Sequence, residues 1–139
     1  MESVKYMRVQ DCPETEAGRR AEGEVDLSAF AGAWLNTNHA TRGIVKIVLS
    51  IRGRDLMVQV FGACDPAPCS WGEVRAEAAY ANSISAREGA GFTALYDFGF
   101  METQLQANLN QGLLVVGSFN RFKDESGRSD YFSREFFHR

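Results

Sequence analysis

Apolar and polar residues alternate along most of the chain after residue 31. The alternation is clearest in two runs, 44–51 and 56–61, which are rich in β-branched and aliphatic side chains. Gly53-Arg54 lies between them, where a two-residue loop would join two antiparallel strands. Opposed residues of such a hairpin share a face, so the pattern predicts three apolar cross-strand pairs on one side: Ile47 with Val60, Leu49 with Val58, and Ile51 with Leu56.

The alternation continues toward the C-terminus. Residues 70–80 are predicted to form one strand with Val74, Ala76, Ala78 and Tyr80 on its inner face. Further strands are expected over residues 92–98, 102–108, 113–122 and 130–139, with no convincing helix of three turns. The facing of residues 102–122 depends on whether Gly112 sits in a bulge, and the pattern leaves both facings open.

About eight consecutive strands joined by short loops predict an all-β fold, an antiparallel up-and-down β-barrel. Residues 1–24 are predicted to form an N-terminal arm, and the sequence leaves open whether this arm is flexible. Their polar composition offers little apolar surface to compensate for the conformational entropy lost on ordering. Residues 25–139 form the predicted barrel domain.

Gly32-Ala33-Trp34 follows a short amphipathic turn with an acidic start, and the chain ends on an aromatic strand that contains Arg134. This pairing resembles the calycin superfamily of lipocalins, fatty-acid-binding proteins and avidins. The resemblance implies a lipocalin-like β-barrel that encloses a pocket, with Trp34 on its floor and Arg134 packed over the indole. Arg139 is the alternative for that floor position, and a ligand contact or a surface position is the alternative for Arg134.

Several aromatic side chains are predicted to point inward, and two alanines on the strand over residues 70–80 would leave room beside them. This arrangement favours the binding of a small, largely apolar molecule inside the barrel. The catalytic residues, if any, are unknown from the sequence. The candidate ligand-binding residues are Tyr80, Phe92, Tyr96, Gln104, Phe132 and Arg134.

Two alternatives remain open. One is a barrel enzyme, a cyclase or isomerase of a small-molecule biosynthetic pathway, in which Tyr80, Tyr96 and Arg134 would polarise a carbonyl. The other is a ligand-free interaction barrel with a packed interior and an exterior apolar patch around residues 48–61. The chain carries no nucleophile motif or glycine-rich phosphate loop. Because a cyclase or isomerase needs mainly a shaped pocket, the absence of these motifs does not exclude an enzyme.

Composition narrows the partners. The net charge of −3 argues against nucleic acid, which selects a basic face, and no apolar run is long enough to span a membrane. Residues 1–5 lack the apolar core of a secretory signal, so we expect a cytoplasmic protein. A small hydrophobic molecule is the expected partner, no cofactor is predicted, and a homodimer is left open.

Three cysteines are present, an odd number. Cys64 and Cys69 flank the loop 65–68, while Cys12 lies in the arm. Cys64 and Cys69 could be free thiols, form a disulfide or bind a metal. We expect free thiols, because a reducing cytosol keeps such pairs open and two thiolates make only half of a zinc site. No metal site is therefore predicted.

Overall fold

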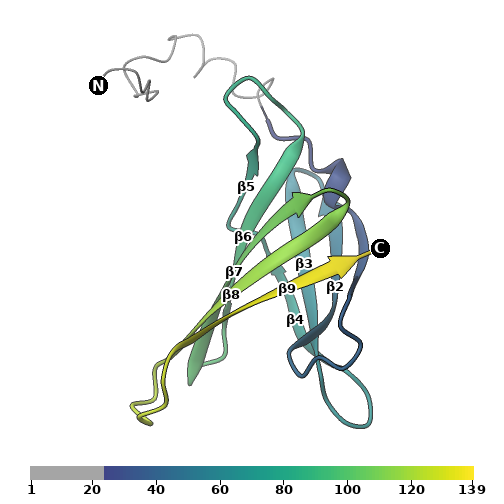
Figure 1. The fold of residues 1–139 in the computed structure, drawn as a ribbon. Coiled ribbons are helices and arrows are strands. Elements are labelled where there is room, and N and C mark those ends of the chain that lie inside the picture. The colour runs from purple at the N-terminus through teal and green to yellow at the C-terminus, as the bar shows by residue number, and fades with distance from the viewer. Residues whose placement is uncertain (1–23) are drawn as a thin grey trace, which may run out of the picture.

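The computed structural model describes residues 24–139, so the predicted arm lies outside the described residues apart from Glu24. A short 3-10 helix, η2 (Ser28–Phe30), precedes the strands (Figure 1). The strands are β1 (Gly32–Asn36), β2 (Ile44–Arg52), β3 (Asp55–Gly62), β4 (Cys69–Arg75), β5 (Ala78–Ala81), β6 (Gly89–Asp97), β7 (Met101–Asn110), β8 (Leu113–Phe122) and β9 (Tyr131–His138).

These strands form one antiparallel sheet in the order β4-β3-β2-β1-β9-β8-β7-β6-β5. Most strands pair with their neighbours in the chain, and β1 also pairs with β9. The sheet curls on itself into a half-barrel, with β2–β4 facing β6–β8 (Figure 1). The all-β antiparallel prediction is confirmed, although the sheet has nine strands rather than eight. No helix within residues 24–139 has the length and apolar character needed to cross a membrane.

The additional strand arises because the predicted strand over residues 70–80 is divided. β4 pairs with β3 at one end of the sheet, whereas β5 pairs with β6 at the other end. The chain crosses between them at two residues: the amide of Ala76 donates to the Leu56 carbonyl at 2.8 Å, and that of Glu77 to the Thr93 carbonyl at 2.7 Å. One bent segment therefore hydrogen-bonds to both ends of the sheet.

This crossing reverses the predicted facing of the second half of the segment. Ala79 of β5 lies opposite the buried Phe92 and packs against the core. Tyr80, predicted to point inward, is therefore on the outer surface, with 54% of its area exposed. Strict alternation through residues 74–80 failed because it assumed an unbroken strand, and a one-residue shift sends every later side chain to the other face.

The β2–β3 hairpin confirms the predicted register. Ile47 pairs with Val60, Leu49 with Val58, and Ile51 with Leu56, with Arg52 and Asp55 closing the turn. The first two pairs are buried. Alternation of β-branched residues around a Gly-containing turn specified this register well because the inner row is apolar throughout, whereas Lys46, Ser50 and Gln59 interrupt the outer row.

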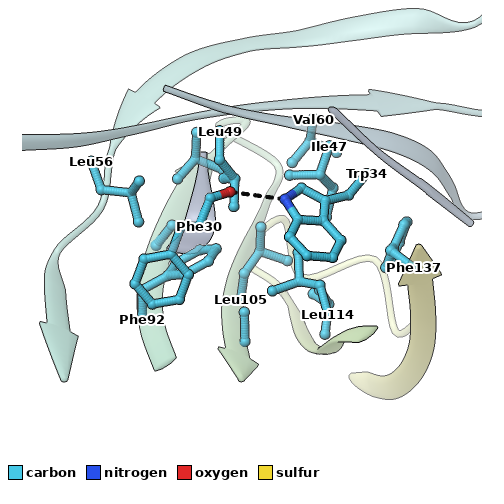
Figure 2. Close-up of a cluster of buried hydrophobic side chains, with 14 of the residues drawn as sticks. Phe30, Trp34, Ile47, Leu49, Leu56, Val60, Phe92, Leu105, Leu114 and Phe137 are labelled. Atoms are coloured by element: carbon cyan, nitrogen blue, oxygen red, sulfur yellow. Dashed lines mark hydrogen bonds between the residues drawn. The ribbon is translucent and has the colours of Figure 1, made fainter. Parts of the chain in front are cut away.

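The core fills the space between the two halves of the curled sheet (Figure 2). Phe30 of η2 meets Phe92 of β6 edge to face, with ring centroids 5.4 Å apart. The buried apolar residues of the strands are Trp34, Ile44, Ile47, Leu49, Leu56, Val58, Val60, Phe92, Ala94, Tyr96, Leu105, Ala107, Leu114, Val116 and Phe137.

The last strand faces the opposite way from the prediction. Phe137 is fully buried, while Phe132 and Phe136 are 48% and 43% exposed and Arg134 lies on the same outer face. The aromatic residues of β9 occupy both alternating rows, so hydrophobicity alone did not distinguish the two facings. The inner row of β9 also contains Ser133 and Glu135, which face a polar part of the interior.

Trp34 lies at the end of the sheet beside η2. Its side chain is 1% exposed, and its indole Nε1 donates a hydrogen bond to the Phe30 carbonyl at 2.9 Å (Figure 2). Arg139, not Arg134, covers the indole, with its guanidinium carbon 4.2 Å from the ring centroid. The Arg139 guanidinium also donates to the carbonyls of Ala29 and Ala31.

The glycine at position 32 permits this packing of Arg139 on Trp34. Its φ of +136° is a conformation that other residues avoid, and a Cβ at this position would lie 3.2 Å from Nε of Arg139. The glycine of the Gly-x-Trp motif thus provides both the backbone turn into β1 and the space for the arginine.

Candidate functional site

The curled sheet opens at the end opposite Trp34. A cleft of about 420 Å³ lies there, among the first residues of β2 and β9, the last of β3 and β8, and the first half of β4. Its lining residues are Arg42, Gly43, Ile44, Gly62, Ala63, Cys64, Cys69, Trp71, Ser118, Asn120, Tyr131, Ser133 and Glu135. We call this space the mouth cleft.

One wall of the mouth cleft is polar and is built from β8 and β9. Ser118 and Ser133 pair across these two strands and both line the cleft. Deeper in this wall, the Thr103 hydroxyl donates to the Asn120 side-chain oxygen at 2.7 Å. Among residues 24–139, every buried side-chain nitrogen or oxygen has a hydrogen-bond partner. This wall is therefore preorganised rather than strained.

Glu135 is the acidic group of the polar wall, and three neutral donors hold its carboxylate. Oε2 accepts from the Asn36 side-chain amide at 2.9 Å and from the Thr41 hydroxyl at 2.5 Å, and Oε1 lies 3.3 Å from the Ile44 amide nitrogen. A Cβ at Gly43 would lie only 2.9 Å from Oε1, so glycine admits the carboxylate. Glu135 thereby fastens the β1–β2 loop to β9.

No ion pair among residues 24–139 includes Glu135. A carboxylate has about four lone-pair positions, and the three donors named above occupy three of those on Glu135. One position on Oε1 is therefore left for a donor that enters the cleft.

The facing wall is aromatic. Trp71 of β4 supplies its ring, which is backed by Tyr96 of β6 and by Phe98, the residue after β6, both edge to face with centroids 5.4 and 5.3 Å away. Tyr96 and Phe98 stack on one another. A Cβ at Gly62 would lie 2.7 Å from the indole Nε1 of Trp71, so the glycine lets the ring approach β3 closely at the edge of the cleft.

The Tyr96 hydroxyl joins the two ends of the sheet. It accepts from the Val60 amide at 3.2 Å, and the carbonyl oxygens of Gly72 and Val58 lie 2.7 and 3.1 Å away as acceptors for its proton. Burial raises the pKa of this phenol to about 12. Because its hydrogen bonds are already made to the backbone, Tyr96 is a structural bridge between β6 and β3–β4.

The structure does not assemble the pocket that the sequence predicted. Of the six candidate ligand-binding residues, Tyr80, Phe132 and Arg134 lie on the outer surface, and Gln104 faces outward beside Phe119. Phe92 is packed into the core. The residues proposed to polarise a carbonyl are thus on different faces, since Tyr96 alone points inward.

The polar residues of the mouth cleft were not predicted from the sequence. A signal for them exists: the inner rows of several strands change from apolar to polar toward the same end of the sheet. The residues that carry this change are Asn36, Thr103, Ser118, Asn120, Ser133 and Glu135. A polar inner row looks like an outer row in a single strand, and only the register between strands identifies it.

Cys64 and Cys69 form a disulfide at the rim of the mouth cleft, with their Cα atoms 5.7 Å apart. The expectation of free thiols is therefore corrected. Two cysteines that bracket a tight loop with prolines come close enough to bond. The expectation of free thiols rested on a reducing cytosol and not on this geometry.

Within residues 24–139, no group of three His, Cys, Asp or Glu side chains is placed to hold a metal ion. Compared with known proteins, the chain matches no family model, no curated protein and no solved structure. The geometry of the mouth cleft is therefore the basis for a functional inference.

Proposed function

We propose that the protein binds an amphipathic small molecule in the mouth cleft. The observation that carries this proposal is the pairing of an aromatic wall at Trp71 with a polar wall at Ser118, Ser133 and Glu135 around one space. The sequence suggested a largely apolar ligand deep in the barrel. The filled core moves the proposed site to the open end and adds a polar requirement.

The size of the mouth cleft supports this proposal. Ligand pockets commonly measure about 300–1,000 Å³ and combine apolar walls with a few placed polar groups. The cleft volume of about 420 Å³ suits a ligand with two or three rings. Much of the cleft is bounded by strands rather than loops, which favours a site that exists before the ligand arrives.

The chemistry of the walls defines the ligand class. The remaining acceptor position on Glu135 favours a ligand with an amino or hydroxyl donor. Trp71 and Ile44 offer apolar surface to a ring or short chain. The proposed ligand therefore carries a hydrogen-bond donor at one end and an apolar body at the other.

We also propose that the fold is of the calycin type. The support is the position of Trp34 after η2, the stacking of Arg139 on its indole, and the neighbour-by-neighbour order of the strands. Arg139 would take the floor position that the resemblance first suggested for Arg134. A calycin-type barrel with Trp34 near its floor agrees with ligand binding at the opposite end.

The test uses N-phenyl-1-naphthylamine, a neutral fluorescent probe with aromatic rings and an N–H donor. Titration of the full chain should give saturable fluorescence with one site. Ser133→Phe places a large side chain in the cleft and should weaken binding about tenfold or more, which corresponds to about 1.4 kcal/mol. Ser85→Phe, an exposed serine in the β5–β6 loop, is the matched control and should bind as the wild type does.

Thermal melts of both variants check that the fold is retained. Saturable binding that Ser133→Phe leaves unchanged would place the probe elsewhere and exclude the mouth cleft. Absence of saturable binding to the wild type would remove the proposal for this ligand class.

A further inference from the structure

The outer face of β6–β9 is nearly free of charge at its centre. The strand registers place three rows of four residues there: Leu95-Gln104-Phe119-Phe132, Thr93-Gln106-Gly117-Arg134 and Gly91-Asn108-Val115-Phe136. Arg134 is the one charged residue among these twelve positions. Other charges lie toward the mouth end of the face, where Glu102 pairs with Arg121. Depletion of charge in an aromatic centre is typical of protein interfaces.

This face exposes more aromatic surface than a solvated sheet needs. Phe119, Phe132 and Phe136 keep 44%, 48% and 43% of their area exposed. Since a phenylalanine offers about 150–250 Å² of surface, these three leave on the order of 250 Å² open to water. Leu95 extends the patch with 37% of its area exposed. Their combined surface approaches the size of the largest apolar patch on a typical monomer, and such a patch often has a function.

The shape of the face combines a ridge with a hollow. The rings of Phe119 and Phe132 lie 4.8 Å apart between centroids and form the ridge. Gly117, in the next row, has no side chain, and a hollow of about 320 Å³ surrounds it. A Cβ at Gly117 would lie 3.1 Å from the Phe132 ring, so the glycine lets that ring lean over its strand.

We propose that this face binds the same face of a second copy of the chain in a two-fold dimer. A two-fold interface requires one patch to fit itself, and an aromatic ridge beside a hollow allows the ridge of each copy to enter the hollow of the other. The amides of Gln104, Gln106 and Asn108 both donate and accept, so they can pair with their own copies and accept from Arg134.

The layout of the face agrees with a dimer interface. A stable interface buries about 800 Å² on each partner, with an apolar centre and a polar rim. The exposed aromatic surface would form the centre, and the surrounding amides would form the rim. A nearly neutral face also lacks the field that would select a nucleic acid or an acidic membrane.

Sedimentation velocity of the full chain tests this proposal, which is independent of the mouth cleft. At concentrations up to about 100 μM, where a dimer with a micromolar Kd assembles, the wild type should sediment at twice the chain mass. Phe132→Lys and Phe119→Lys should each raise the dimer Kd about a hundredfold. Phe100→Lys is the matched control, because Phe100 is 47% exposed in the β6–β7 turn, and should leave the Kd unchanged.

Circular dichroism spectra and thermal melts show whether each variant keeps its fold. A wild type that remains monomeric over this range overturns the proposal. A dimer that withstands both ridge substitutions also overturns it, because the copies would then meet through another surface.

Discussion

The guanidinium of Arg139 lies over the indole of Trp34, 4.2 Å from the ring centroid, where the first and last strands meet. The pairing of Leu35 with His138 and of Asn36 with Phe137 sets this position, because the next residues in that register are Trp34 and Arg139. The arginine also donates to two carbonyls beside η2. One side chain thus joins the C-terminus, the 3-10 helix and the tryptophan.

Substitutions at this contact should show whether Arg134 or Arg139 stabilises the floor position over Trp34. We expect Trp34→Ala to cost about 3–5 kcal/mol as a large buried truncation. Arg139→Ala should cost about 1–2 kcal/mol, because it removes an exposed cation–π contact and two hydrogen bonds. Arg134→Ala is the matched control and should stay within about 0.5 kcal/mol. Urea unfolding measures all three, and a larger effect at Arg134 than at Arg139 would contradict this floor.

The Tyr96 bridge should contribute to stability through its hydroxyl alone. Tyr96→Phe leaves the Val60 amide and the Gly72 carbonyl without this partner, so we expect a loss of about 1–3 kcal/mol. Tyr131→Phe, a change at an exposed tyrosine, should be nearly neutral. Equal stability of the two variants in urea would show that the hydroxyl does not hold the ends of the sheet together.

The raised pKa of Tyr96 also predicts a pH dependence. The folded pKa of about 12 lies above the usual value of 10, so the folded state holds this proton more tightly than the unfolded state does. The stabilisation is complete below pH 10 and is lost as the pH rises from 10 to 12, by at most about 2–3 kcal/mol. Wild type and Tyr96→Phe should therefore converge in stability over that interval, as unfolding at pH 9 and pH 11.5 can test.

Glu135 should order the β1–β2 loop. Glu135→Ala removes the acceptor of Asn36, Thr41 and the Ile44 amide, so that amide should exchange its hydrogen faster. Glu77→Ala, a change at an exposed glutamate, serves as the control. Hydrogen exchange followed by mass spectrometry reports on residues 37–44, and unchanged protection there would mean that the carboxylate does not fasten the loop.

The disulfide predicts a simple peptide result. Trypsin should release residues 55–75, which contain both Cys64 and Cys69. Without reductant, this peptide should resist alkylation and be lighter by two hydrogen atoms than its reduced form. Alkylation of both cysteines before reduction would instead support the free thiols expected from the sequence.

The parts of the fold that the sequence predicted are those where one alternating row is apolar throughout and polar residues interrupt the other row. The β2–β3 hairpin is the best example, because Lys46, Ser50 and Gln59 occupy its other face. In β9 both rows contain aromatic residues, so the facing was assigned wrongly. The division at Ala76 and Glu77 depends on contacts with Leu56 and Thr93, which are distant in the sequence.

The candidate site was harder to predict for a related reason. Ser133 and Glu135 look like solvent-facing residues in a strand, and their inward position follows from the register with β8. The aromatic residues favoured as pocket walls instead fill the core, as Phe92 does, or lie outside, as Phe132 does. Aromatic content therefore indicated neither the location nor the polarity of the mouth cleft.

The two tryptophans offer the most direct test of ligand binding at the mouth cleft. Trp71 lines the cleft, whereas the indole N–H of Trp34 is buried and bonded to Phe30 at the opposite end. In ¹H–¹⁵N spectra of the full chain, adding N-phenyl-1-naphthylamine should shift the Trp71 indole signal and the amides of Gly62 and Ser133, while the Trp34 signal stays in place. Shifts confined to the outer face, or no shift at Trp71 as the probe saturates, would contradict binding in the mouth cleft.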